Sequence, residues 1–132
     1  MRTLLAQVLA CGLGGFVGAI LRFGATLGIQ KLARGPYATL TVNLLGCLVL
    51  GLLLGASQDG ERLSPEARSF LAVGVLGSFT TFSTFSGEAV ELLRERQHLA
   101  AAGYVLLSVV LGLLLFAGGH ELALRWSGGA QG

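Results

Sequence analysis

The chain has 132 residues, of which 53% are hydrophobic and 12% are charged, and its mean hydropathy is +0.74. A soluble domain normally carries about a quarter charged residues, so this composition excludes an ordinary soluble enzyme and indicates a protein that resides in a lipid bilayer. The net charge of +2 is too small to indicate a nucleic-acid partner.

Four stretches without a charged residue follow one another along the chain. They contain 19, 24, 19 and 24 residues and cover 3–21, 35–58, 69–87 and 97–120. A helix that crosses a bilayer needs about 20 residues. We therefore predict an all-α integral membrane protein, a single domain over 1–132, with transmembrane helices at approximately 3–29, 37–58, 66–93 and 98–121. No room remains for a catalytic domain, and the sequence has no nucleophile–base pair or cluster of metal ligands, so we predict that the protein is not an enzyme.

The first stretch has an alternative interpretation as a cleaved signal peptide. Arg2 alone is a weak positive region, and the apolar run exceeds the roughly 7–15 residues of a signal sequence. We interpret this stretch as the first span. Cys11 and Cys47 fall in the middle of spans, where we expect small buried hydrophobic side chains and no disulfide.

Glycines recur inside the predicted spans at a spacing of four residues. The pairs are Gly14 and Gly18, Gly24 and Gly28, and Gly51 and Gly55. Small residues at this spacing let membrane helices approach closely, so we expect a tightly packed bundle.

The second and fourth spans each carry polar residues on one helical face. Asn43 follows Thr39 by one turn, and Ser108 follows Tyr104 by one turn. A hydrogen bond between helices explains each residue on its own. Together with the third span, they predict a track of hydrogen-bond donors that contains no central carboxylate.

The third span is the most unusual part of the chain, because residues 74–88 read GVLGSFTTFSTFSGE. Six hydroxyl groups in nine residues are costly in hydrocarbon unless each finds a partner. Gly74 and Gly77 weaken the helix before this run, and we expect a break near 77–81, where backbone carbonyls and amides would be exposed at mid-membrane. Such a break is tolerated only where protein or an ion satisfies those groups.

Three phenylalanines in this run recur every three residues. Phe79, Phe82 and Phe85 would form a drifting stripe on a helix, and a lipid-facing or packing stripe is the simplest explanation. Aromatic rings have a positive edge, however, and serine and threonine hydroxyls donate hydrogen bonds, so the same residues can contact an anion. Glu88, Glu91 and Glu95 follow, and we expect them on a solvated or interfacial face rather than in a proton relay.

The predicted loops are short, so that consecutive helices are antiparallel and both termini lie on one side of the membrane. Ser64 and Pro65 form a plausible N-cap and first helical residue at the start of the third span. Arg22 lies near the end of the first span, where its side chain reaches the interface and attracts anions to the mouth of the donor track.

The positive charges of the loops are balanced between the two sides of the membrane. One side carries Arg2, Arg62, Arg68 and Arg125, and the other carries Lys31, Arg34, Arg94 and Arg96. Four against four gives the positive-inside rule little to act on, although Arg22 tips the balance by one. A chain without an orientation preference can insert both ways, which predicts an antiparallel homodimer. The alternative is that the charges of a small protein balance by chance.

Three motifs in this order resemble the Fluc (CrcB) family of small fluoride channels: GGFVGAILRF at 14–23, ATLTVNLLGCLVLG at 38–51, and the third-span run at 74–88. The resemblance covers all four spans. It implies a multi-pass protein of a prokaryotic cell (inner) membrane that exports cytoplasmic fluoride by passive electrodiffusion. It also implies a dual-topology, antiparallel homodimer with two pores and a third helix broken near its middle.

The resemblance also implies roles for individual residues. The paired pore phenylalanines match Phe82 and Phe85, and the vestibule arginine matches Arg22. The other pore residues that it implies are Asn43, Ser108, Thr80, Thr81, Ser83 and Thr84, with Tyr104 on the same track. A structural sodium ion at the dimer centre is held in the family by backbone carbonyls that match Gly77 and Thr80. Some members carry a further hydroxyl where this chain has Gly112.

Two other functions compete with this interpretation. A small proton-coupled multidrug-type exporter also has four spans, but it needs a titratable residue deep in the membrane, and the first span here has no carboxylate. A structural subunit that packs through glycine faces would leave the hydroxyl run unexplained.

Overall fold

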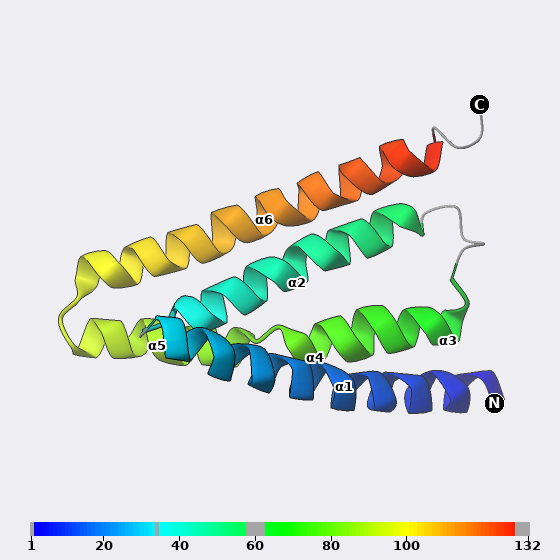
Figure 1. Ribbon diagram of the computed structural model, residues 1–132, viewed down its shortest axis with the longest axis horizontal. Coiled ribbons are helices and arrows are strands. Elements are labelled where there is room, and N and C mark those ends of the chain that lie inside the picture. Colours follow the sequence, from blue (N-terminus) through cyan, green and yellow to red (C-terminus); the bar gives the residue numbers. More distant parts are fainter. Residues whose placement is uncertain (1, 34, 58–62, 129–132) are drawn as a thin grey trace.

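The computed structural model describes residues 2–33, 35–57 and 63–128, and all secondary structure in these residues is helical (Figure 1). The elements are α1 (Arg2–Leu32), α2 (Tyr37–Ala56), α3 (Pro65–Arg68), the π-helix η1 (Ser69–Leu76), α4 (Gly77–Phe79), α5 (Phe82–Arg94) and α6 (His98–Gly128). Four helical stretches are long and apolar enough to cross a membrane: Thr3–Leu32, Tyr37–Ala56, Pro65–Arg94 and His98–Ser127. The predicted all-α class with four spans is confirmed. Arg34, Arg62 and the expected end of the second span at 58 lie outside the described residues.

The helices run up and down in two closely packed pairs. Helix α2 packs along α6, and α1 packs along η1 and α4. Figure 1 shows that α1 begins, and α6 ends, at the same end of the bundle. The short helix α5 lies at the opposite end, beside the first half of α6.

Glycine backbones form the contacts within each pair. A side chain at Gly14 or Gly18 of α1 would collide with backbone atoms of Phe70 or Val75. A side chain at Gly51 or Gly55 of α2 would likewise collide with the backbone of α6. Two of the three predicted glycine pairs therefore allow close helix packing. The third pair, Gly24 and Gly28, faces open space in the described chain.

The third span is assembled from several helical pieces. The Ser64 hydroxyl accepts a hydrogen bond from the Ala67 amide at 3.1 Å, with Pro65 at the first helical position, which confirms the predicted cap. The π-helix η1 follows, and α4 ends at Phe79. Thr80 (φ −81°, ψ 159°) and Thr81 (φ −150°, ψ 117°) then have extended backbones before α5 begins.

The contrast between the glycine pairs of α1 gives a direct test of the packing. We expect Gly18→Ala to lower the free energy of unfolding by about 1–3 kcal/mol, because the added methyl group overpacks the contact with Val75. Gly28→Ala serves as the matched control on the same helix, because a methyl group there meets no atom. Thermal stability in detergent, followed by loss of the monodisperse peak in gel filtration, measures both. Equal losses in the two variants would contradict the proposed close contact.

Candidate functional site

The side chain of Asn43 joins α2 to the interruption between α4 and α5. Its Nδ2 donates to the carbonyl oxygen of Thr81 at 3.1 Å, and its Oδ1 accepts from the Thr81 amide at 2.8 Å. One primary amide thus satisfies both backbone groups of a residue that has left the helix. A backbone that departs from helical geometry inside a membrane needs such partners, because no water is available there.

This pairing changes the hydrogen bonds of two backbone carbonyls on the preceding turn. In a continuous α-helix the amide of Thr81 donates to the carbonyl of Gly77, and that of Thr84 donates to Thr80. Here the Thr81 amide donates to Asn43, and the Thr84 amide donates to the Thr81 hydroxyl at 3.2 Å. The Gly77 and Thr80 carbonyls therefore lose their helical donors. Arg22 Nη1 of α1 donates to the Thr80 carbonyl at 3.4 Å.

A cavity of about 280 Å³ lies beside the interruption, between α2, α5 and α6. The Phe82 and Phe85 rings border it with centroids 5.6 Å apart and planes inclined at 43°. The Phe85 ring also meets the Tyr104 ring at 5.3 Å. Phe82 is 80% exposed in the single chain, although it is a large hydrophobic residue. The complete lining is Asn43, Gly46, Cys47, Leu50, Thr80, Thr81, Phe82, Phe85, Ser108 and Val109.

Most hydroxyl groups near the cavity already have partners. The Thr80 hydroxyl donates to the Leu76 carbonyl at 3.1 Å, and the Thr81 hydroxyl donates to that of Thr84 at 3.0 Å. Ser83 Oγ lies 3.3 Å from the Thr81 hydroxyl. The Ser108 hydroxyl is different, because it is shielded from solvent and has no hydrogen-bond partner among the described residues. An unpartnered buried hydroxyl costs about 1–3 kcal/mol, which makes it a ready donor to a guest in the cavity.

Glu88 occupies a position that the sequence analysis did not anticipate. Its Oε1 accepts from the Thr39 hydroxyl at 2.8 Å, and its Oε2 accepts from the Tyr104 hydroxyl at 2.7 Å. Thr39 and Tyr104 are buried and Glu88 is half-buried, so a fully solvated position is wrong for Glu88. An interfacial position is not contradicted, because Glu88 also borders a surface pocket with the exposed Glu91 and Glu95.

A signal for this cluster is present in the sequence. Thr39 precedes Asn43 by one turn on α2, and Tyr104 precedes Ser108 by one turn on α6. Where α2 and α6 pack together, Asn43 and Ser108 line the cavity, and Thr39 and Tyr104 lie one turn before them. Two hydroxyl donors side by side can share a carboxylate as their acceptor. Glu88 is the acidic residue of α5 nearest to the hydroxyl run.

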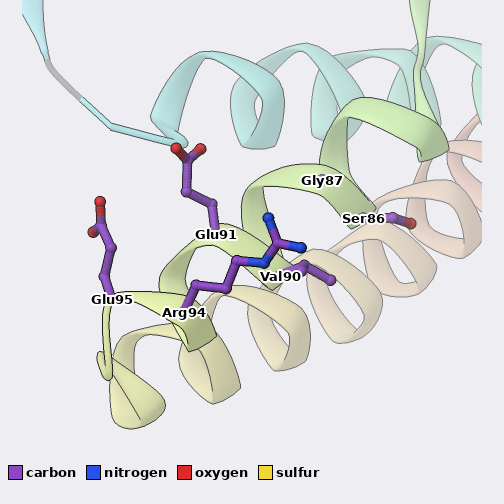
Figure 2. A pocket seen from close by; sticks show the side chains of 6 residues that line it. All are labelled: Ser86, Gly87, Val90, Glu91, Arg94 and Glu95. Carbon is purple, nitrogen blue, oxygen red and sulfur yellow. The ribbon is translucent and has the colours of Figure 1, made fainter.

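A separate groove of about 760 Å³ runs along the outer side of α5. Figure 2 shows the Glu91, Arg94 and Glu95 side chains projecting around it. Ser86, Gly87 and Val90 complete its lining, so that it shares no residue with the aromatic cavity. Its wall comes from a single helix, and it has the character of an open, charged surface rather than of an enclosed site.

The structure brings together six of the predicted site residues and leaves the others outside the cavity. Those that line it are Asn43, Thr80, Thr81, Phe82, Phe85 and Ser108. Arg22 and Gly77 lie around the helix interruption. Ser83 and Thr84 are exposed on the first turn of α5, and Tyr104 is buried against Glu88.

Comparisons with known proteins identify close relatives over nearly the whole chain. Residues 9–120 match the family model described as CrcB-like protein, Camphor Resistance (CrcB). A protein of Nautilia profundicola named fluoride-specific ion channel FluC is 44% identical over 114 residues, which are 84% of this chain and 88% of that protein. A protein of the same name from Chloroflexus aurantiacus is 45% identical over 125 residues, 93% of this chain and 98% of that protein. Its counterpart in Chlorobium phaeobacteroides is 41% identical over 123 residues, with 92% and 96% covered.

The bidentate contact of Asn43 can be tested by its removal. We expect Asn43→Ala to lower the free energy of unfolding by about 2–5 kcal/mol, because both backbone groups of Thr81 lose their partner in a half-buried place. Thr41→Ala is the control from the same helix, since the Thr41 hydroxyl only donates to the Tyr37 carbonyl one turn earlier. Urea or thermal unfolding in detergent gives both values. A loss for Asn43→Ala no larger than that for Thr41→Ala would show that the contact is dispensable.

Proposed function

The chain belongs to the CrcB family, and on that premise we propose that it is a fluoride-specific ion channel of the cell membrane rather than an enzyme. The structural observation that carries this proposal is the cavity lined by Phe82, Phe85 and Ser108, together with the buried Ser108 hydroxyl, which has no hydrogen-bond partner among the described residues. Ring edges and a hydroxyl hydrogen are the positive ends of their groups, so each can face a small anion. Among the residues that the structure describes, no carboxylate lines this cavity.

Fluoride is the anion that the names of the relatives indicate, and the aromatic cavity offers ring edges and a free hydroxyl to it. It is a small and strongly hydrated anion, and it crosses a bilayer only if protein groups replace its water. We propose Asn43, Ser108, Phe82 and Phe85 as the principal lining of the path, with Thr80 and Thr81 beside them. We assign Ser83, Thr84 and Arg22 to the approach, where hydroxyls and a positive charge raise the local concentration of anions.

Tyr104 has a different role in this proposal from a direct fluoride donor. Its single hydroxyl proton goes to Glu88, as does that of Thr39. These two bonds tie α2, α5 and α6 together beside the cavity and occupy both carboxylate oxygens of Glu88. Tyr104 therefore supports the path from behind, because its ring packs against that of Phe85 with the centroids 5.3 Å apart.

The proton-coupled exporter receives less support. Such a transporter needs a titratable carboxylate exposed to its substrate pathway. Glu88 is the one candidate near the cavity in the part of the chain that the structure describes, and both its oxygens are engaged by hydroxyl donors. The relatives are also named as ion channels.

We further propose that the functional unit is an antiparallel, dual-topology homodimer with two pores. The single chain exposes 8741 Å², against about 6,600 Å² for a typical soluble monomer of its mass. Phe82 is mostly uncovered although it borders the cavity, and a second copy would cover it. The balanced loop charges are compatible with the mixed insertion that this assembly requires.

The same proposal includes a sodium ion at the dimer centre, held by the Gly77 and Thr80 carbonyls of both subunits. Those two carbonyls are the ones whose helical donors are diverted to Asn43 and to the Thr81 hydroxyl, so their chemistry suits a hard cation. The Arg22 guanidinium uses one side of the Thr80 carbonyl, which has a second lone pair for another partner. The ion would supply positive charge where two helix breaks meet.

Substitution of the two rings tests the pore assignment. We expect Phe82→Ile and Phe85→Ile to lower fluoride efflux from proteoliposomes by about tenfold or more, because isoleucine keeps the apolar bulk but lacks the positive ring edge. Efflux is recorded with a fluoride electrode while a potassium ionophore clamps the voltage, without a proton gradient. Phe16→Ile, at an exposed position of α1, should leave the rate unchanged. Wild-type efflux rates in both pore variants would show that Phe82 and Phe85 serve only in packing. A strict requirement for a proton gradient would favour the exporter.

Dual topology has its own test, which is independent of flux. A single cysteine introduced as Leu63→Cys, in a chain that also carries Cys11→Ala and Cys47→Ala, is labelled in intact cells by an impermeant thiol reagent. We expect about half of the molecules to react from outside, because the loop charges set no preferred orientation. Uniform labelling or uniform protection would overturn the proposed mixed insertion.

A further inference from the structure

We propose that Cys47 is a covalent modification site inside the cavity, at which small uncharged thiol-directed reagents attach and close the ion path. The closure rests on the proposed channel function. The attachment rests only on the position of the thiol. Cys47 is not among the pore residues proposed above.

Cys47 stands in the second span, one turn after Asn43. Its thiol is free, and the residue is half-buried. It borders the same cavity of about 280 Å³ as the rings of Phe82 and Phe85. A group attached to its sulfur therefore enters the space between the aromatic rings and α6.

The neighbouring residue of α6 defines one side of the Cys47 sulfur. Gly112 is buried, and a Cβ atom there would lie 3.5 Å from Cys47 Sγ. The sulfur thus lies against the bare backbone of α6, where no side chain separates the two helices. A larger group on Sγ cannot move in that direction, because α2 and α6 are packed closely. The cavity is the open direction.

A second observation indicates that this cavity takes a guest. Ser108 lies one turn before Gly112 on α6 and lines the same space. Its hydroxyl is shielded from solvent and has no partner among the residues that the structure describes. A buried donor left unpaired is costly, so it is satisfied when an acceptor occupies the cavity. A group attached to Cys47 would compete with that acceptor for the same volume.

The chemistry requires a reagent that is small, uncharged and specific for thiols. Methyl methanethiosulfonate meets these conditions and crosses lipid bilayers. The Cys47 thiolate attacks the divalent sulfur of the reagent, a new S–S bond forms to the methylthio group, and the S–S bond of the reagent breaks. The thiol proton passes to water and methanesulfinate leaves with the electron pair of the broken bond. The thiolate is the reacting form, so mildly alkaline solution favours the reaction.

Cys11 provides a matched control within the same chain. It is also a free, half-buried cysteine of a transmembrane helix. It lies on α1, where its carbonyl packs against Gly74 of η1, and it does not line the aromatic cavity. Modification of Cys11 should therefore leave the path open.

Fluoride efflux from proteoliposomes, measured before and after the reagent, tests the inference. In the wild type and in Cys11→Ala, we expect the rate to fall by about tenfold or more, because the attached group occupies the space beside the Phe82 and Phe85 rings. Dithiothreitol, which cleaves the mixed disulfide, should restore it. In Cys47→Ala and in the near-isosteric Cys47→Ser, the efflux rate after the reagent should equal the rate of the same variant before it. Intact-protein and peptide mass spectrometry on the same samples reports which cysteine carries the added group.

Each outcome decides one part of the proposal. The proposal would be overturned if the reagent still lowered fluoride efflux in both Cys47 variants. It would also be overturned if Cys47 were fully modified without loss of efflux. The absence of modification at Cys47 in folded protein, when the same residue reacts after unfolding, would overturn it as well. If untreated wild-type protein passes no fluoride, the proposed channel function fails. Mass spectrometry still shows whether Cys47 is reachable in that case.

Discussion

The paired hydrogen bonds between the Asn43 side chain and the backbone of Thr81 set the geometry of the whole site. They hold two extended residues inside a membrane-spanning segment, and unpaired backbone groups there would each cost several kcal/mol. They also fix where α5 begins, and so how the Phe82 and Phe85 rings are aimed. The same contact releases the Gly77 and Thr80 carbonyls from helical pairing. The Asn43 side chain of α2 thus determines both how the two phenylalanine rings are oriented and which two carbonyls lack a helical donor.

Helix packing makes that contact possible at the required distance. Gly14 and Gly18 bring α1 against η1, and Gly51 and Gly55 bring α2 against α6, with backbone on backbone in each pair. The two pairs of helices enclose the polar groups from opposite sides, whereas most apolar side chains of α1 and α6 point outward. Lipid, or a second copy of the chain, covers this apolar surface without contributing a hydrophobic force between the helices.

Sequence reasoning predicted the four helices well because a charge-free stretch of bilayer length has few other structural solutions. It singled out Asn43 and Ser108 as polar residues among apolar ones, and the family resemblance implied Phe82 and Phe85. The structure places these four residues at one cavity. Sequence reasoning did not anticipate the partners of Glu88, because Thr39 and Tyr104 lie on helices that are far apart in sequence and meet only in the folded bundle. It overlooked Cys47 as a cavity residue, since a cysteine in a span is usually a small buried hydrophobe. The open surroundings of Gly24 and Gly28 show that glycine spacing permits close packing but does not require it.

The π-helix η1 has a consequence for how this segment tolerates change in chain length. Each residue of an α-helix turns by about 100°, and a π-helical stretch accommodates residues beyond those that α-helical winding would hold. Loss of a single residue between Ser69 and Leu76 would let this stretch rewind as an α-helix, because π-helical winding holds more residues than the α-helical turns that it replaces. Thr81 would then keep roughly its direction toward Asn43. The same deletion in the α-helical part of the span would rotate all later residues by about a third of a turn. The π-helical stretch is therefore the part of the third span in which a one-residue change of length is best tolerated.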